Sequence, residues 1–331
     1  MITHDTHGQL ACLNWQTLSD QRAATVRPNN GIFRTAFIVT GACNFACPYC
    51  KTVGPGKTTL PTMKREKALA LLESFANQGL RELRISGGEP TIVPWLPELV
   101  ALATSRKIRV AISSNGYADL SVYDALVDAG VAEFSISLDS LDAEEADRMS
   151  GGRKDVLARV TRTIRHLSSR DVKVYIGMVC CGSGKTPESI QRVLASVAEM
   201  GVTDVKIMPP SQDGNVIEGA WLPEELTERF PFLAWRSRNF NKGKGVRGIP
   251  ETSSPKCFLA LDDATISGEQ HYPCNVYLRE GGAPIGNTSP TMMADRAAWC
   301  EGHNSHEDPI CRGMCMDLLR AYNDRAQQLQ A

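Results

Sequence analysis

Residues 34–50 read RTAFIVTGACNFACPYC, a short run of β-forming residues followed directly by three cysteines. Cys43, Cys47 and Cys50 form a C-x3-C-x2-C pattern just beyond that run. If the run is a strand of a parallel sheet, the three thiolates converge on one point at the carboxyl edge of the sheet. Three ligands leave one position of a metal centre open, as a catalytic centre requires. The alternative is a zinc site completed by a distant residue.

Outward from this stretch, the chain alternates β-rich runs with helical patterns. Val156, Val160 and Ile164 recur at helical spacing, and Thr186-Pro187 is typical of a helix start. Six β/α units in series predict a parallel sheet with helices outside, because parallel neighbours need right-handed crossovers. The sheet is either doubly wound or barrel-like, and both place ligands at the carboxyl ends of the strands. The predicted strands are 34–40, 82–86, 108–113, 132–138, 172–179 and 203–208.

The composition limits the class of protein. The chain has 331 residues, 22% of them charged, with a net charge of −1 and 11 cysteines. No stretch approaches the ~18 apolar residues of a membrane span, and the start MITHDTHGQL lacks the features of a signal peptide. We therefore expect a soluble, cytoplasmic protein whose cysteines bind metal or do chemistry. Without a global basic charge, nucleic acid is not expected as the main partner.

Motifs follow four successive predicted strands. The first is the C-x3-C-x2-C run, with Tyr49 before its last cysteine. The other three motifs are Gly87-Gly88-Glu89-Pro90, Ser113-Ser114-Asn115-Gly116 and Ser137-Leu138-Asp139-Ser140. Together these motifs resemble those of the radical S-adenosylmethionine (SAM) enzymes. The resemblance spans roughly residues 33–208 and implies the family fold, a partial (β/α)6 TIM-like barrel.

The resemblance implies a 4Fe-4S cluster on Cys43, Cys47 and Cys50, whose open iron SAM chelates through its amino and carboxylate groups. One electron then cleaves SAM to methionine and a 5′-deoxyadenosyl radical, which takes a hydrogen atom from the substrate. A donor such as a flavodoxin or ferredoxin supplies that electron. The residues expected to bind the cofactor are Tyr49, Gly87, Gly88, Glu89, Ser114, Asn115, Ser137 and Met208.

Within the family, residues 84–167 are most similar to the GTP cyclase of molybdenum-cofactor synthesis, as in LRISGGEP and SISLDSLD. Arg84, Ser113 and Lys173 match positions that hold the substrate in that enzyme. For Lys173 and Met208 the alternatives are a solvated strand end and core packing. The chain lacks the C-terminal Gly-Gly tail and cysteine spacing of the cyclase, so the activity of the cyclase is not carried over.

A second cysteine group fills the last quarter of the chain and resembles the SPASM/Twitch extension, which holds auxiliary 4Fe-4S clusters. Its pattern is Cys257-x10-Gly268-x5-Cys274 followed by Cys311-x3-Cys315. The group has five cysteines instead of the seven of the full SPASM set, which favours the Twitch form with one cluster. The expected ligands are Cys257, Cys274, Cys311 and Cys315, with Cys300 as the alternate. The alternative is a zinc site drawn from Cys300, His303, His306, Cys311 and Cys315.

Cys180 and Cys181 end the fifth predicted strand, at the edge where catalysis occurs in such barrels. Either is a candidate donor of a hydrogen atom to a substrate radical, which would make the outcome an epimerisation. The alternative is a buried pair that fills core volume. Because side chains alternate along a strand, at most one of the two faces inward.

These patterns divide the chain into an N-terminal extension (1–32), the barrel (33–210), a connection where the alternation stops (211–256) and a Twitch-like domain (257–331). The predicted function is radical chemistry on a small polar substrate such as a sugar, aminocyclitol or nucleoside, ending in oxidation or epimerisation. One alternative is a peptide-modifying enzyme of the same subclass. Another, from a different class, is an iron-sulfur binding or scaffold protein without catalysis.

Overall fold

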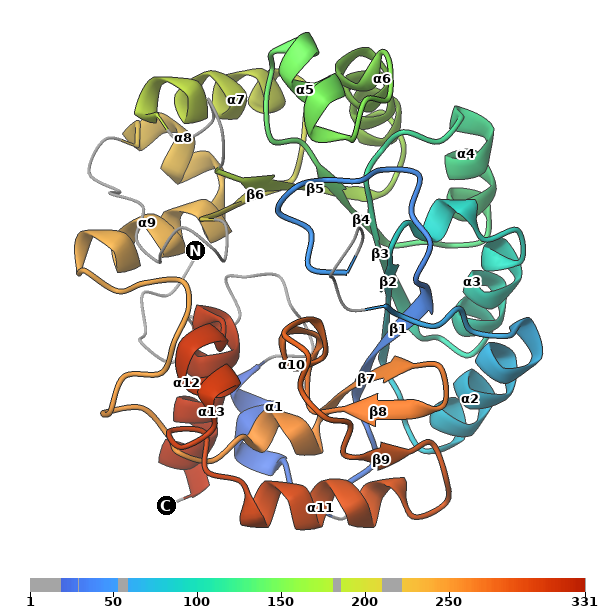
Figure 1. The fold of residues 1–331 in the computed structure, drawn as a ribbon, viewed down its shortest axis with the longest axis vertical. Coiled ribbons are helices and arrows are strands. Elements are labelled where there is room, and N and C mark those ends of the chain that lie inside the picture. The colour runs from blue at the N-terminus through green and yellow to red at the C-terminus, as the bar shows by residue number, and fades with distance from the viewer. Residues whose placement is uncertain (1–18, 29, 53–58, 181–185, 210–221, 331) are drawn as a thin grey trace.

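The computed structural model describes residues 19–28, 30–52, 59–180, 186–209 and 222–330, and strands alternate with helices through most of this chain (Figure 1). The strands of the first part are β1 (Arg34–Thr40), β2 (Glu82–Gly87), β3 (Arg109–Ser114), β4 (Glu133–Ser137), β5 (Lys173–Val179) and β6 (Asp204–Met208). The helices of that part are α1 (Asp20–Thr25), α2 (Arg65–Asn77), α3 (Leu96–Ser105), α4 (Leu120–Asp128), α5 (Ala143–Met149), α6 (Val156–Ser168) and α7 (Pro187–Glu199), with a 3-10 turn η2 (Pro90–Ile92).

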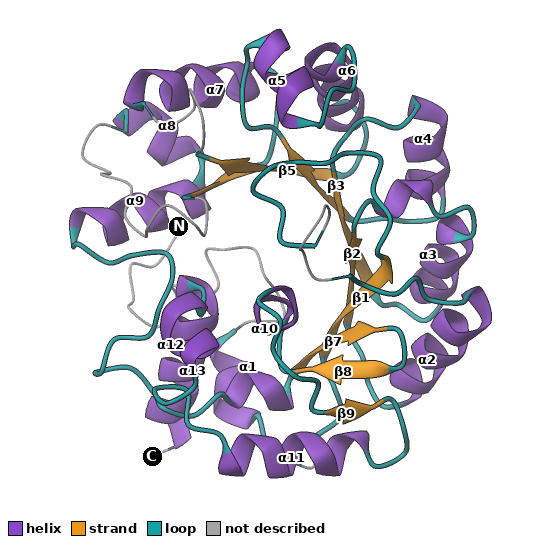
Figure 2. Ribbon diagram, viewed as in Figure 1, coloured by secondary structure: helices purple, strands orange, loops and turns teal. Residues whose placement is uncertain are grey.

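The six predicted strands are confirmed to within one residue at each end. Neighbouring strands pair in parallel in the order β6-β5-β4-β3-β2-β1, with Arg34 opposite Glu82 in the β1–β2 register. All seven residues of β1 are buried, as expected for a parallel strand covered on both faces. Figure 2 shows the strands as a curved wall with α2 to α7 on its outer side.

The C-terminal part extends the same sheet. Strand β7 (Asp263–Ser267) pairs in parallel with β1, and β8 (Gln270–Tyr272) and β9 (Gly286–Asn287) follow antiparallel, giving nine strands in all within the described residues. The fold is therefore α/β, with six parallel strands and added C-terminal strands. The other elements of this part are η4 (Phe258–Leu261), α10 (Asn275–Arg279), α11 (Met292–Gly302), α12 (Pro309–Met314) and α13 (Asp317–Gln330).

The connection expected over residues 211–256 contains two helices that the sequence analysis does not predict, α8 (Glu224–Arg229) and α9 (Pro231–Asn241). The prolines and aromatic residues of this stretch suggested a loop. Pro231 instead occupies the start of α9, where its missing N–H costs nothing. The backbone N–H of Phe232 donates to Asp204 Oδ2 at 2.7 Å, which fixes α9 against the start of β6.

A second core lies apart from the barrel. It joins α1, α9, η4 and α13, and its buried residues include Ala23, Phe232, Leu259 and Tyr322. The Arg236 guanidinium of α9 lies 2.8 Å from the Asp317 carboxylate of α13, and both are buried. Residues before and after the barrel thus share one apolar cluster.

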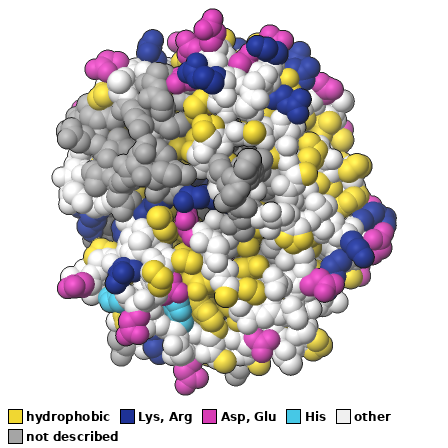
Figure 3. All heavy atoms as spheres, viewed as in Figure 1, with side chains coloured by type: hydrophobic (Ala, Val, Ile, Leu, Met, Phe, Trp, Pro, Cys, Tyr) yellow, Lys and Arg dark blue, Asp and Glu magenta, His cyan; other side chains and the backbone are white. Residues whose placement is uncertain are grey.

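The described helices include none that is long and apolar enough to cross a membrane. Figure 3 shows acidic and basic side chains interspersed around the rim of the viewed face, without a large area of one sign.

Candidate active site

A cavity of about 400 Å³ lies at the carboxyl ends of the parallel strands. Its lining comes from the loop after β1 and from the ends of β2 to β6, as expected for a parallel α/β sheet. Every residue predicted to bind the cofactor lines it: Tyr49, Gly87, Gly88, Glu89, Ser114, Asn115, Ser137 and Met208. Separate stretches of the chain that the motifs singled out therefore meet in one place.

The loop after β1 brings Cys43, Cys47 and Cys50 to the wall of this cavity. Hydrogen bonds to the segment after α5 hold the loop in place. Ala46 N–H donates to Ser150 O at 2.7 Å, and Arg153 Nε donates to Asn44 O at 2.6 Å. Figure 1 shows it crossing the middle of the curved sheet.

The three thiols fit a metal cluster. Burial raises the pKa of Cys43, and burial together with Asp139 and the neighbouring cysteines raises the pKa of Cys47 to about 12. Without a cation the thiols of Cys43 and Cys47 therefore stay protonated. A bound iron cluster would reverse this balance, since a metal stabilises thiolates.

Gly88 follows β2 directly and contacts the backbone at the start of the cysteine loop. Its backbone N–H donates to Thr40 O at 2.7 Å, and a Cβ on this residue would press on the backbone oxygen of Ala42, just before Cys43. Only glycine permits so close an approach of two backbones.

Glu89 organises the ends of β2 and β3. Its buried carboxylate accepts hydrogen bonds from Thr91 N–H and Oγ1, from Ser114 Oγ at 2.9 Å and from Asn115 N–H at 2.7 Å. Burial raises the pKa of Glu89, against the lowering effect of these donors. Glu89 thus positions two other predicted cofactor residues.

The sequence analysis missed Asp139, which follows β4 and lines the same cavity. The Tyr49 hydroxyl donates to Asp139 Oδ2, and Val179 N–H donates to Oδ1 at 2.8 Å. Burial raises the pKa of Asp139 to about 6. The sequence signal was the position of Asp139 directly after a strand, within a motif already noted.

A second cavity of about 300 Å³ lies deeper in the barrel. It shares Ser113, Met208 and Val276 with the first, and its lining carries charges of both signs. Arg84 Nη2 lies 2.7 Å from Asp263 Oδ2. Of the residues predicted to hold substrate, Arg84 and Ser113 line this cavity, whereas Lys173, at the start of β5, lines neither of the two.

A third, smaller cavity lies between η4, α10 and α12. Four predicted ligands of the auxiliary cluster line it, namely Cys257, Cys274, Cys311 and Cys315. Burial is the main cause that raises the pKa of Cys257 to about 11 and of Cys274 to about 12, so this donor set also fits a cationic centre. The alternate, Cys300, does not line the cavity, and its Sγ lies 3.4 Å from the backbone oxygen of Cys257.

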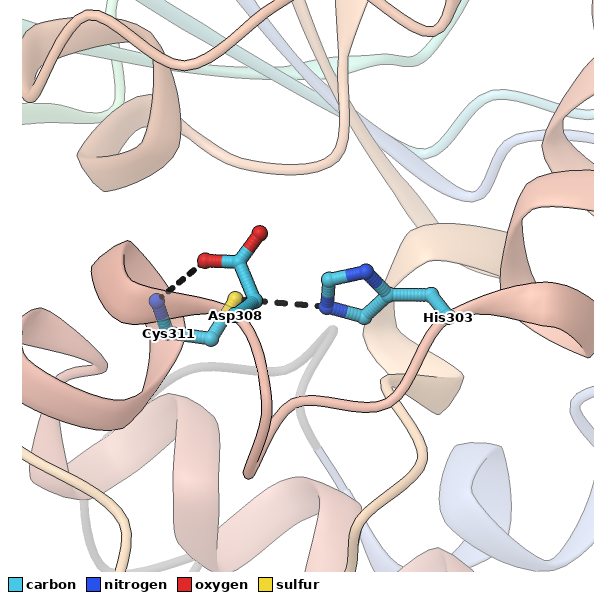
Figure 4. Close-up of side chains that lie close together, drawn as sticks. All are labelled: His303, Asp308 and Cys311. Atoms are coloured by element: carbon cyan, nitrogen blue, oxygen red, sulfur yellow. Dashed lines mark hydrogen bonds between the residues drawn. The ribbon is translucent and has the colours of Figure 1, made fainter.

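Only some of the predicted zinc ligands lie close together in the structure. Figure 4 shows His303, Asp308 and Cys311 side by side, with their candidate ligand atoms within 4.8 Å of one another. His303 Nε2 lies 3.4 Å from Cys311 Sγ. Among the described residues, this group contains only two members of the predicted zinc set, His303 and Cys311. The other three, Cys300, His306 and Cys315, do not belong to it, and Asp308 was not predicted.

Cys180 follows β5 and is 5% exposed within the main apolar core. It is not among the residues that line the first two cavities, whereas its neighbour Val179 lines the first. Cys181 lies outside the described residues. The hypothesis that Cys180 or Cys181 donates a hydrogen atom stays a prediction.

Comparisons with known proteins agree with this arrangement. Residues 37–197 match the model of the radical SAM superfamily. GTP 3',8-cyclase from Aliarcobacter butzleri (strain RM4018) is 32% identical over 233 residues, which are 68% of this chain and 68% of that protein. GTP 3',8-cyclase from Chlorobaculum tepidum is 39% identical over 133 residues, and this match covers only 39% of this chain and 39% of that protein.

A solved structure shares the fold. SuiB from Streptococcus suis superposes with a TM-score of 0.59 at 15% sequence identity, covering 85% of this chain and 67% of SuiB. The fold, the three-cysteine cavity and these matches define an iron-sulfur enzyme that uses SAM. The chain belongs to the radical SAM superfamily.

Proposed function

We propose that this radical SAM enzyme oxidises a small polar substrate held in the deeper cavity, between two iron-sulfur sites. The proposal rests on residues that line more than one of the three cavities. Val276 lines all three cavities, and Cys274 lines both the deeper cavity and the C-terminal one. A substrate in the deeper cavity would therefore adjoin the SAM site on one side and a cysteine of the C-terminal site on the other.

In this proposal Cys43, Cys47 and Cys50 hold the SAM cluster, and Cys257, Cys274, Cys311 and Cys315 hold one auxiliary 4Fe-4S cluster. When bound, the first cluster supplies the electron that cleaves SAM, and the second supplies an acceptor for the electron that the substrate gives up. The domain division at residues 211–256 stays a proposal, with 257–331 as the Twitch-like part.

The residues of the chain place and shield the reactants. Gly87 and Gly88 let the end of β2 approach the backbone of Thr40 and Ala42 beside the cysteine loop, while Glu89 holds Ser114 and Asn115 at the rim. The deeper cavity is balanced in charge: Arg84, Arg109, Lys206 and Arg236 face Glu82, Glu133, Asp263 and Asp317. Such a lining suits a neutral or zwitterionic substrate with several hydroxyl or amino groups.

Protein reconstituted anaerobically with iron and sulfide, then given dithionite and SAM, tests the proposal. We expect slow release of 5′-deoxyadenosine without substrate, and none from the Cys43→Ala variant. Failure of fully loaded protein to release any would favour the scaffold alternative.

Candidate sugars, aminocyclitols and nucleosides assayed in deuterated water then identify the outcome. A product lighter by two hydrogens, with no deuterium at carbon, supports oxidation. One deuterium gained at an unactivated carbon, and lost in Cys180→Ala or Cys181→Ala, would instead establish epimerisation and overturn the oxidation.

A further inference from the structure

His303 follows the end of α11 and reaches toward the cysteines of the third cavity (Figure 4). Its Nε2 lies 3.4 Å from Sγ of Cys311, an expected ligand of the auxiliary cluster. Its ring stacks on that of Trp299, with the centroids 4.0 Å apart and an angle of 17° between the planes. Its backbone N–H also donates to Trp299 O at 2.9 Å. One face of the imidazole therefore packs on Trp299, while an edge nitrogen meets the sulfur.

Cys311 is held just as firmly, at the start of α12. Asp308 caps this helix: its Oδ1 accepts the N–H of Cys311 at 2.8 Å, and its Oδ2 accepts the hydroxyl of Tyr277 at 2.9 Å. The Tyr277 ring in turn meets the His303 ring edge-on, with the centroids 6.5 Å apart. Both partners of the His303–Cys311 contact are thus fixed by other side chains.

The direction of this hydrogen bond follows from the expected state of Cys311. A cysteine that ligates iron is a thiolate, which can only accept a hydrogen bond. Nε2 of His303 must then carry the hydrogen and donate it. A donor beside a ligand sulfur stabilises the negative charge that a cluster gains on reduction, so it raises the reduction potential.

We propose that His303 is a positioning residue that raises the reduction potential of the auxiliary cluster through Cys311. This inference rests on the proposed function, in which that cluster accepts an electron. After hydrogen abstraction, the substrate radical would lose one electron to the oxidised cluster, which is reduced, and one proton to water. A higher potential of the cluster favours this transfer.

Two other predicted ligands of the cluster also meet donors. The backbone N–H of Tyr277 lies 3.4 Å from Cys274 Sγ, and Nδ2 of Asn323 lies 3.8 Å from Cys257 Sγ. Substitution cannot remove the first donor, because it is main chain. Asn323 is buried, and its Oδ1 also accepts a backbone N–H of η4 at 2.9 Å, so its loss would disturb the second core. His303 is therefore the donor whose effect on the cluster can be tested most cleanly.

The test is a redox titration of full-length, cluster-loaded protein, followed by electron paramagnetic resonance. A second titration with Cys43, Cys47 and Cys50 replaced by alanine assigns the signal of the auxiliary cluster. His303→Phe keeps a ring against Trp299 but lacks the N–H. Loss of one hydrogen bond to a thiolate should shift the balance between the two oxidation states about tenfold toward the oxidised cluster, a potential about 59 mV lower for one electron.

Two variants serve as controls. His303→Gln carries an amide N–H at a similar reach and should keep part of the wild-type potential. Nε2 of His306 makes no hydrogen bond with any described residue, and His306 lies outside the group of Figure 4, so His306→Phe should change the balance by less than about twofold. Iron content and circular dichroism of each variant are compared with the wild type, so that cluster loss is not scored as a shifted potential.

The proposal is overturned if His303→Phe with two clusters titrates at the wild-type potential, or if His306→Phe lowers the potential as much. Loss of the auxiliary iron from both His303→Phe and His303→Gln would make His303 a ligand, which also overturns it. If only His303→Phe loses this iron, the potential of His303→Asn, whose amide is shorter, decides in its place.

These outcomes separate the role of His303 from the proposed function. An unchanged potential in a two-cluster protein contradicts the role of His303 alone. A wild-type protein that holds only about four irons, with no signal once Cys43, Cys47 and Cys50 are replaced, contradicts the proposed auxiliary cluster and this inference with it.

Discussion

At the scale of single residues, the C-terminal cysteines differ in what surrounds them. Cys315 lines the third cavity with three other thiols, whereas Cys300 is buried beside the backbone oxygen of Cys257 and outside that cavity. Spacing along the sequence could not separate these two, since both are near Cys311 in the chain. Their surroundings now assign them different expected roles.

Cys315→Ala should remove the auxiliary cluster, whereas Cys300→Ala should retain it. A two-cluster protein holds about eight irons per chain, so we expect about four in Cys315→Ala and about eight in Cys300→Ala. Iron analysis with electron paramagnetic resonance checks this. Equal iron loss in both variants would contradict the assignment, and one bound zinc in place of iron would favour the His303–Asp308–Cys311 group.

At the scale of elements, the end of β2 packs closely against the backbone of the cysteine loop. Gly88→Ala would force the backbone of Ala42 away, and with it the start of the cluster loop. We expect a loss of about 1–3 kcal/mol of stability and of most iron from the SAM site. Urea unfolding and iron content measure both effects.

The control for this substitution is Gly302→Ala at the end of α11, where an added Cβ meets nothing within 4 Å. It should be neutral or stabilising by up to about 1 kcal/mol, with iron retained. If Gly88→Ala behaves like this control, the close approach does not matter for cluster assembly.

Strand β8 carries a histidine that must stay neutral. His271 is fully buried, and its Nδ1 lies 3.1 Å from Arg296 Nη1, which can only donate. Burial, with the charge of Arg296, lowers the pKa of His271 to about 4. The unfolded chain, with a histidine pKa of about 6.5, takes up the proton first as pH falls. Stability from this residue is therefore complete above about pH 6.5 and is lost toward pH 4.

Between pH 7 and pH 5 the wild-type protein should lose about 2 kcal/mol more stability than His271→Gln. Urea unfolding of both proteins at the two pH values gives this difference, and comparison of the two removes any shared acid lability of the clusters. An identical pH dependence would show that His271 does not titrate between the folded and unfolded states.

Some of the strands and their motifs could be predicted from the sequence, and others could not. Buried parallel strands are continuous β-branched runs, so β1 to β6 and the motifs at their ends were found locally. The pairing of β7 with β1 joins residues more than 200 positions apart, and no local pattern encodes it. The same applies to Arg279, which reaches the site only because α10 folds back over it. Asp139 was missed because its role depends on Tyr49, on another loop.

At the scale of the whole molecule, the C-terminal part and the barrel share one sheet. β7 covers the edge of β1, and Asp263 of β7 pairs with the buried Arg34. The N-terminal helix α1 in turn packs against α13 in the second core. The cysteine-rich part is thus continuous with the barrel through both main-chain pairing and apolar contacts.

A chain that ends at residue 256 should therefore be insoluble, because β1 becomes an open edge and Arg34 loses its carboxylate. A chain that ends at residue 287 keeps β7 to β9 and should be recovered in the soluble fraction to a greater extent. Comparing soluble yields of the two tests this. Equal yields would mean that the exposed edge of β1 is not the cause.

The same pairing imposes an order on biosynthesis. The cysteine loop after β1 leaves the ribosome more than 200 residues before α10, the helix that later lines the same cavity. During this interval three thiols meant for one cluster are open to oxidants and to stray metal ions. Delivery of iron and sulfide after release of the chain, rather than during its synthesis, would place the metal in a cavity whose walls are already complete.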